Sequence, residues 1–270
     1  MEEKIGNNVF LNFERTKREE YEVTDYSIDI LQKHYSYLNK DNYCFKSYQD
    51  NRRQMSSPGA FLESRNKNGI DIVGDILTSY KDIENDDNIA KCVKNRYKLV
   101  YHSIGNILPI PEGANYGGKK TDNYYCKLNN IKEWLERKAT GEKIVTKDEE
   151  QMVINRLNTG LYLSAPAKGK DYPAFNNKIV MRYWLAKQRY FKTWKNYVIE
   201  NYLVDFVDFV DDNFKVKEFS YQEQQVDKLV EYIICRNYRI LHSKKMEKIQ
   251  YEEEFIQFKD AIERELFLGL

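Results

Sequence analysis

The sequence is poor in the residues that build metal sites and disulfide frameworks. Its 270 residues include four cysteines and three histidines, which are Cys44, Cys92, Cys126, Cys235, His34, His102 and His242. No two cysteines form a CxxC pair, so the spacing lacks the usual zinc-binding patterns and favours reduced thiols. We therefore expect a cytoplasmic protein that holds no metal ion and no other cofactor.

Long apolar runs are missing as well, and so is an excess of charge of either sign. No stretch approaches the roughly 18 apolar residues that a membrane-spanning helix needs. The first residues, Met1–Lys4, lack the basic flank and apolar stretch of a secretory signal peptide. Lys plus Arg number 43 and Asp plus Glu 42, so no whole-protein field attracts nucleic acid or an anionic membrane. We expect no membrane association, although a local basic patch is compatible with these totals.

Aromatic residues are abundant, with 22 Tyr and 13 Phe. Each buried ring removes a large area from water, so aromatic packing is expected to supply much of the folding free energy. Hydrophobic residues make up 41% of the chain and charged residues 31%, which is typical of a folded globular protein. The composition thus predicts a soluble protein with an aromatic-rich core.

Apolar residues recur at helical spacing along most of the chain, which predicts a mainly α-helical fold. Capping boxes at Thr146–Glu149 and Ser220–Glu223 indicate two helix starts. The expected helices cover residues 27–38, 71–83, 89–102, 128–138, 146 onward, 175–211 with one break, 220–246 and 251–268. A short β pair is compatible with the first 60 residues or with residues 214–221. We expect a single compact helical domain over residues 1–270, or two domains divided near 140–146 or 164–173.

The most distinctive segment runs from His102 to Gly118 and contains two prolines and four glycines. These residues exclude a regular helix, while several Ile and Leu side chains indicate burial, so we expect a rigid, partly buried loop that crosses the core. Glycines allow a ligand to approach closely, and successive backbone N–H groups can bind an anion. The candidate ligand-binding residues are His102, Gly105, Asn106 and Asn115. The same segment also fits a purely structural crossover loop whose asparagines satisfy backbone groups.

Two blocks of the chain resemble an uncharacterised prokaryotic family, a domain of unknown function. The first block is similar to that family's Thr-Ile-Gly-Asn or Thr-Ile-Gly-Gly motif, which precedes a proline and an asparagine. It comprises Ser103-Ile-Gly-Asn106, Pro109, Pro111 and Gly113-x-Asn115. The second block comprises Trp194-Lys-Asn-Tyr197 and Tyr202-Leu-Val-Asp-Phe206-Val. The resemblance covers about residues 70–240 and implies one domain, but it implies no activity.

A further motif, Arg236, Asn237 and His242, falls on the helix expected over residues 220–246. It resembles the Arg-polar-x-His signature of HEPN ribonucleases, helical proteins in which two such motifs meet across a homodimer. The resemblance implies that His242 is the acid/base on the RNA 2′-hydroxyl, that Arg236 stabilises phosphate charge and that Asn237 orients both. Residues six apart lie about 120° apart around an ideal helix. A surface arginine near a partly exposed histidine therefore fits the pattern as well.

Two other stretches have ordinary structural interpretations. Residues 182–195 interleave cations with aromatic rings, as single-stranded nucleic-acid platforms do, but their apolar members follow one face of an amphipathic helix. The carboxylates of Asp205, Asp208, Asp211 and Asp212 share a helix face that could bind Mg²⁺ with a second acidic helix. No second cluster of matching spacing is present, so a solvated face is the simpler interpretation.

Two function classes follow from these features. The leading hypothesis is a non-enzymatic binding protein that uses residues 103–118 and a neighbouring aromatic groove to bind a protein, an RNA or a small ligand. The alternative is a metal-independent, homodimeric ribonuclease resting on Arg236 and His242, as in toxins and phage-defence effectors.

Overall fold

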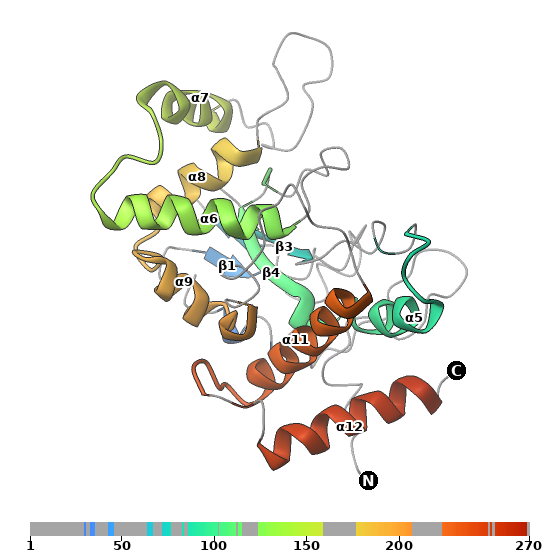
Figure 1. Cartoon of the computed structure of the whole chain (residues 1–270). Coiled ribbons are helices and arrows are strands. Elements are labelled where there is room, and N and C mark those ends of the chain that lie inside the picture. The colour runs from blue at the N-terminus through green and yellow to red at the C-terminus, as the bar shows by residue number, and fades with distance from the viewer. Residues whose placement is uncertain are drawn as a thin grey trace.

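In the computed structural model, the described part of the chain is mainly α-helical (Figure 1), as the sequence predicts. Short strands accompany the helices. The structure describes residues 30, 33–35, 43–45, 64–66, 72–76, 83, 86–101, 103–111, 113–114, 124–158, 177–206, 223–247, 249 and 252–268.

The helices begin and end close to where the sequence pattern places them. They are α5 (Lys91–Val100), α6 (Tyr124–Ala139), α7 (Lys147–Asn158), α8 (Asn177–Lys187), α9 (Trp194–Glu200), α11 (Glu223–Leu241) and α12 (Glu253–Leu268). The capping box before α7 is confirmed, since Thr146 and Glu149 each accept the other's backbone N–H, at 3.2 and 3.0 Å. The predicted break within residues 175–211 separates α8 from α9, where the Thr193 hydroxyl accepts the N–H of Asn196.

The strands form an antiparallel sheet, which is larger than the expected β pair. Its described strands follow the order β1 (Tyr43–Phe45), β2 (Ser64–Asn66), β3 (Ile72–Ile76) and β4 (Ile107–Pro111). Strand β3 pairs with β4 along its whole length, from Ile72 opposite Pro111 to Ile76 opposite Ile107. The helix predicted over residues 71–83 is therefore wrong across 72–76, because pairing with a distant strand outweighs a local helical pattern.

Residues 103–111 of the Pro- and Gly-containing segment are buried, in line with the partial burial expected, but they have regular structure instead of a loop. A 3₁₀ turn, η3 (Ile104–Asn106), leads directly into β4, and every residue from 103 to 111 is buried. Strand β4 stands at one end of the order of described strands. An edge strand has a neighbouring strand on one side only. A proline there removes no hydrogen bond between strands when its nitrogen faces the other side. Pro109 and Pro111 therefore fit a strand here.

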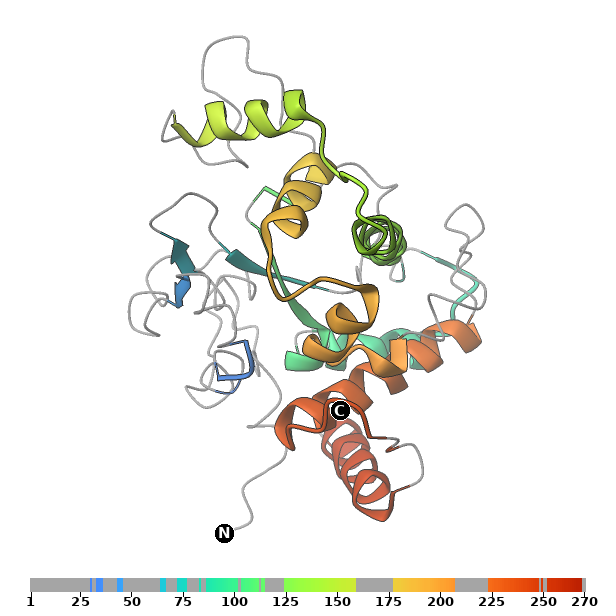
Figure 2. The same ribbon diagram turned by 90° about the vertical axis from the view of Figure 1, so that its left-hand side faces the viewer.

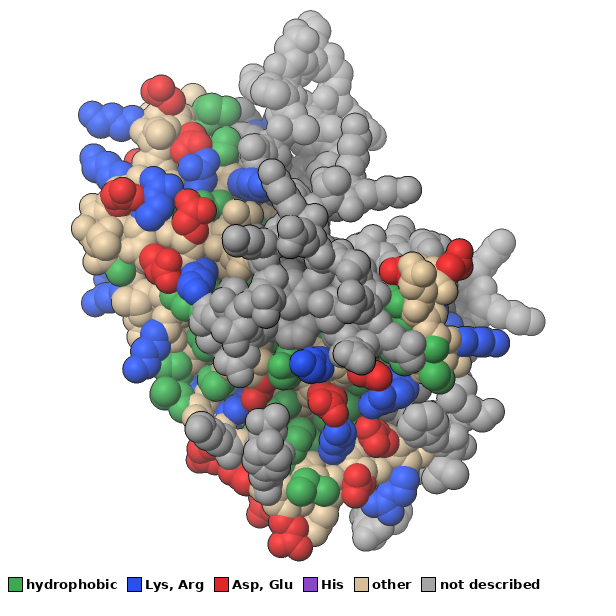
Figure 3. All heavy atoms as spheres, viewed as in Figure 1, with side chains coloured by type: hydrophobic (Ala, Val, Ile, Leu, Met, Phe, Trp, Pro, Cys, Tyr) green, Lys and Arg blue, Asp and Glu red, His purple; other side chains and the backbone are tan. Residues whose placement is uncertain are grey.

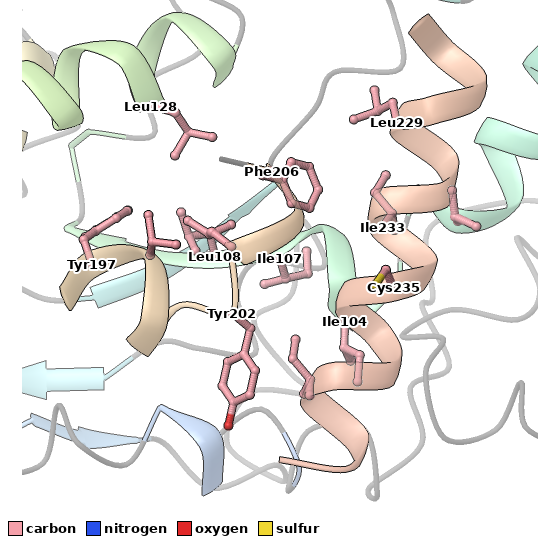
Figure 4. Packing of buried hydrophobic residues seen from close by; sticks show 14 of the residues in the cluster. Ile104, Ile107, Leu108, Leu128, Tyr197, Tyr202, Phe206, Leu229, Ile233 and Cys235 are labelled. Carbon is pink, nitrogen blue, oxygen red and sulfur yellow. The ribbon is translucent and has the colours of Figure 1, made fainter. Parts of the chain in front are cut away.

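Helix α11 runs through the middle of the core, between the η3–β4 segment and α12 (Figures 1 and 2). In the cluster of Figure 4 its side chains Ile233 and Cys235 lie beside Ile104 and Ile107, and Leu229 lies one turn earlier along α11. All five side chains are buried. Helix α5 also packs against α11, so this one helix organises most of the core.

A smaller hydrophobic cluster joins α7 to α8 through Val153 and Val180, both fully buried. An ion pair between Arg182 of α8 and Glu149 of α7 joins the same two helices. No helix in the described ranges combines the length and the apolar character needed to traverse a lipid bilayer.

Candidate functional site

The dominant polar feature of the core is the guanidinium of Arg236, which α11 places against the start of β4. The residue is fully buried. Its Nη1 donates to the carbonyls of Gly105 and Ile107, at 2.6 and 2.8 Å, and its Nε donates to the carbonyl of Asn201 at 3.0 Å. Nη2 donates to the hydroxyl of Tyr35 at 2.5 Å. One side chain thus joins α11 to the η3–β4 junction, to the end of α9 and to the first described helical turn.

The next residue on α11, Asn237, holds η3 from a second direction. Its Oδ1 accepts the backbone N–H of Gly105 at 2.5 Å, and its Nδ2 donates to the Ser103 hydroxyl at 3.0 Å. A Cβ atom added to Gly105 would lie 2.3 Å from the carbonyl oxygen of Ile233 and 2.7 Å from Asn237 Oδ1. Only glycine allows the two backbones to approach this closely.

The remaining polar groups of η3 are also satisfied inside the protein. The Ser103 hydroxyl donates to the carbonyl of Val100, and Nδ2 of Asn106 donates to the carbonyl of Tyr101, both at 2.8 Å. Two of the predicted ligand-binding residues, Gly105 and Asn106, are therefore brought together, but in the interior. The other two, His102 and Asn115, lie outside the described residues.

A group of tyrosines surrounds the buried arginine, and sequence reasoning did not single it out. Tyr35 comes from the first described helical turn, Tyr197 from α9 and Tyr202 from the turn after α9, and each is at most 1% exposed. The Tyr202 hydroxyl lies 2.9 Å from Nδ1 of His34. The high tyrosine content, and the place of Tyr197 and Tyr202 in the second resembling block, were the signals in the sequence, and neither indicates which rings meet.

The electrostatic environment of this tyrosine group is positive. Burial, together with the charges of Lys33, Lys245 and Arg236, lowers the pKa of His34 to about 4. Burial raises the pKa of Tyr202 to about 12. At neutral pH the His34 ring is therefore uncharged and Tyr202 keeps its proton, so one ring nitrogen is able to accept the Tyr202 O–H.

Two residues near this group adopt the left-handed backbone conformation, Tyr202 with φ of 56° and Ser243 with φ of 55°. Each follows the last turn of a helix, α9 and α11 respectively, where this conformation ends the helix. It is uncommon for residues other than glycine and costs roughly 1–3 kcal/mol. At Tyr202 the surrounding contacts keep a fully buried ring in place despite that cost.

The structure does not bring the predicted catalytic residues together within one chain. Arg236 and Asn237 are fully buried, and their side chains bond to η3 and β4. His242 lies just after α11 and is exposed, with its ring centroid 4.4 Å from that of Tyr238. Burial and the charge of Lys244 lower the pKa of His242. The described contacts thus give Arg236 and Asn237 structural roles.

The acidic stretch after α9 also has a structural partner on α11. Asp205 accepts from Nε and Nη2 of Arg239, whose side chain is 1% exposed. Such a bidentate pair satisfies a buried guanidinium. The other three aspartates of the predicted acidic face lie outside the described residues. Burial and the Asp205 charge raise the pKa of the neighbouring Cys235 thiol.

Acidic and basic side chains are intermixed over the coloured part of the face in Figure 3. Among the described residues, no group of three or more His, Cys, Asp or Glu is placed to hold a metal ion. No protein-family model, no curated protein and no solved structure matches the chain. The resemblance to an uncharacterised prokaryotic family therefore stays a prediction from the sequence.

Proposed function

We propose that this chain is a non-enzymatic, cytoplasmic binding protein whose partner contacts the chain where it leaves β4, around residues 112–118, and the aromatic residues beside it. The supporting observation is the double attachment of residues 103–107 to α11 by Arg236 and Asn237. Because residues 103–107 are already fixed in the unbound protein, they lose little further conformational entropy when a partner binds to this part of the chain. Gly113 and Ala114, at the end of the described segment, are themselves buried.

A protein partner fits better than an RNA partner. RNA binding draws much of its affinity from clusters of Lys and Arg that contact phosphates. In this chain the charges nearly balance, and the basic side chains on the described face of Figure 3 alternate with acidic ones. Several basic side chains are also engaged in ion pairs, including Arg96 with Asp227 and Lys259 with Glu231.

A ribonuclease centred on Arg236 and His242 is supported less well. Four hydrogen bonds hold the Arg236 side chain in the core, so reaching a phosphate would require breaking contacts that fix η3 and β4. No described contact links Arg236 to His242.

The proposal is tested by quantitative affinity capture from a lysate of the source organism. Asn115→Ala should reduce the captured partner about tenfold or more, as expected for a residue central to an interface. Asn155→Ala is the matched control, because Asn155 is exposed on α7 and its side chain bonds only to that of Gln151 within the described part of the chain. It should capture as much partner as the unmodified chain. Equal capture by both variants, or no specifically enriched protein, would contradict the proposal.

A further inference from the structure

Arg236 is a buried cation without a carboxylate partner among the described residues. The contrast is Arg239, one helical turn further along α11, which is equally buried and pairs with Asp205. Arg236 bonds instead to three carbonyl oxygens and one hydroxyl, all formally neutral. Burying a charge is costly unless an opposite charge or a full set of hydrogen bonds offsets the lost hydration.

Two hydrogen-bond donors of α9 are also without an acceptor. The hydroxyl of Tyr197 and Nε1 of Trp194 are buried and make no hydrogen bond within the described part of the chain. The two rings stack on each other, with centroids 5.8 Å apart and planes at 16°. Tryptophan Nε1 can only donate, so an acceptor is what this pair lacks. A buried polar atom without a partner indicates a missing water or ligand.

The two features belong to one region of the core. Nη2 of Arg236 bonds to the Tyr35 hydroxyl, and that bond uses one of its two hydrogens. Nε of Arg236 donates to the Asn201 carbonyl, and Nδ2 of Asn201 donates to the Tyr197 carbonyl, so Asn201 joins Arg236 to the helix that carries Tyr197. The charge of Arg236 also acts on the Tyr197 phenol, whose pKa is raised chiefly by burial. Lys245 lies over the Tyr202 ring at 5.8 Å, but its ion pair with Glu200 offsets its charge, so Arg236 is the buried, unpaired cation of this region among the described residues.

We propose that a small anion binds among Arg236, Tyr35 and Tyr197, accepting the free hydrogen of Arg236 Nη2 and the Tyr197 hydroxyl. Chloride, inorganic phosphate and a carboxylate share the required chemistry, which is negative charge combined with the capacity to accept hydrogen bonds. The anion would act as the counter-ion of Arg236 and stabilise the junction of α9, α11 and β4. This inference does not depend on the partner proposed for residues 112–118.

The experiment compares thermal unfolding in sodium chloride, phosphate and acetate with unfolding in sodium gluconate, an anion too large for a buried site, at equal ionic strength. Ligand that binds only the folded state raises the midpoint, here by about 2–6 °C at saturation. Tyr197→Phe should lose most of that rise. Tyr238→Phe is the matched control, because Tyr238 is equally buried and its hydroxyl bonds to Glu254. The Tyr238→Phe variant should keep the rise in the unfolding midpoint. Comparing chloride with phosphate and acetate distinguishes a halide site from an oxyanion site.

A second readout follows the His34 ring by nuclear magnetic resonance. A bound anion nearby should raise the pKa of His34 from its value of about 4, whereas a buried water would leave it unchanged. If Tyr197→Phe does not fold, Tyr35→Phe replaces it, since Tyr35 belongs to the proposed site and this variant removes only its hydroxyl. Equal anion effects on the unmodified chain and on both site variants would overturn the proposal, as would an absence of any difference from gluconate.

Discussion

Oδ1 of Asn237 lies 2.5 Å from the backbone nitrogen of Gly105, a residue 132 positions earlier in the chain. The same amide donates to the Ser103 hydroxyl, so one side chain bonds both to Gly105 within η3 and to Ser103 directly before it. Because both groups are buried, neither finds water if the amide is removed. The contact between α11 and η3 is therefore expected to depend on Asn237 more than on any single apolar side chain nearby.

Asn237→Ala should lower the free energy of unfolding by about 2–4 kcal/mol, because it leaves the buried N–H of Gly105 without an acceptor and removes the bond that the buried Ser103 hydroxyl accepts. Urea unfolding followed by circular dichroism measures the change. Asn88→Ala is the control, since Asn88 is exposed and, among the residues that the structure describes, its side chain bonds only to Asp86. Similar losses in both variants would show that the Asn237 contacts are not important for stability.

Gly105→Ala should destabilise the protein by about 3 kcal/mol or more, because the added methyl group meets the Ile233 carbonyl at 2.3 Å. Gly141→Ala provides a control of a different kind. Gly141 has φ of 85° but no atom within 4 Å of an added Cβ, so only backbone strain of about 1 kcal/mol is expected. If Gly105→Ala cost no more than Gly141→Ala, the close packing of η3 on α11 would be refuted.

The sequence predicts best those elements whose signals are local. The helix over residues 89–102 is confirmed as α5, and the reciprocal bonds of Thr146 and Glu149 are confirmed before α7. Both depend on residues within a few positions of each other. Strand β3 was mistaken for a helix because its partner, β4, lies more than thirty residues away. Local periodicity carries no signal for such a pairing.

The buried polar site was harder to predict for a related reason. Arg236 was expected to act on a ligand or to lie on the surface, since arginine is rarely fully buried. Its acceptors are backbone carbonyls of residues 105, 107 and 201, and backbone groups have no signature in the sequence. The sequence marked Gly105 as a position that another group can approach closely. It did not indicate that this group is helix α11.

Arg236→Gln should reduce the free energy of unfolding by about 3–5 kcal/mol, because several buried acceptors lose their donor at once. Arg236→Lys should recover only a small part of this loss, since a single ammonium group cannot match the spread of the guanidinium. Arg264→Gln is the matched control, as Arg264 is exposed and donates only to the carbonyl of Asp260. A loss below 1 kcal/mol for Arg236→Gln in the same urea titrations would contradict the structural role given to this residue.

Purified protein incubated with mixed RNA in EDTA should leave the RNA intact, because the bonds that hold Arg236 keep it away from the exposed His242. Any residual cleavage should be the same for His242→Ala, which removes the acid/base of the ribonuclease hypothesis. Gel electrophoresis of the RNA over time measures the outcome. Cleavage that His242→Ala abolishes would restore the nuclease and require Arg236 to leave the core.

The pH dependence of stability should reveal the neutral state of His34. Its pKa is about 4 in the folded chain and about 6.5 when unfolded, so between these values the unfolded chain binds a proton that the folded chain does not. The resulting stability is fully present above pH 6.5 and is lost as the pH falls towards 4. After allowance for partial exposure, the loss is roughly 1–3 kcal/mol.

His34→Asn removes the titrating ring and keeps an acceptor near the Tyr202 hydroxyl. Between pH 7 and pH 4.5, the free energy of unfolding of this variant should therefore fall less than that of the unmodified chain, by the amount that His34 contributes. Carboxylates also titrate in this range, but they contribute equally to both proteins and cancel in the difference. His242→Gln is the control for a surface histidine whose pKa is also lowered, and its effect should be smaller because that ring is exposed. Urea titrations at four or five pH values give the comparison. Parallel profiles for His34→Asn and the unmodified chain would mean that His34 is protonated as readily in the folded protein as in the unfolded one.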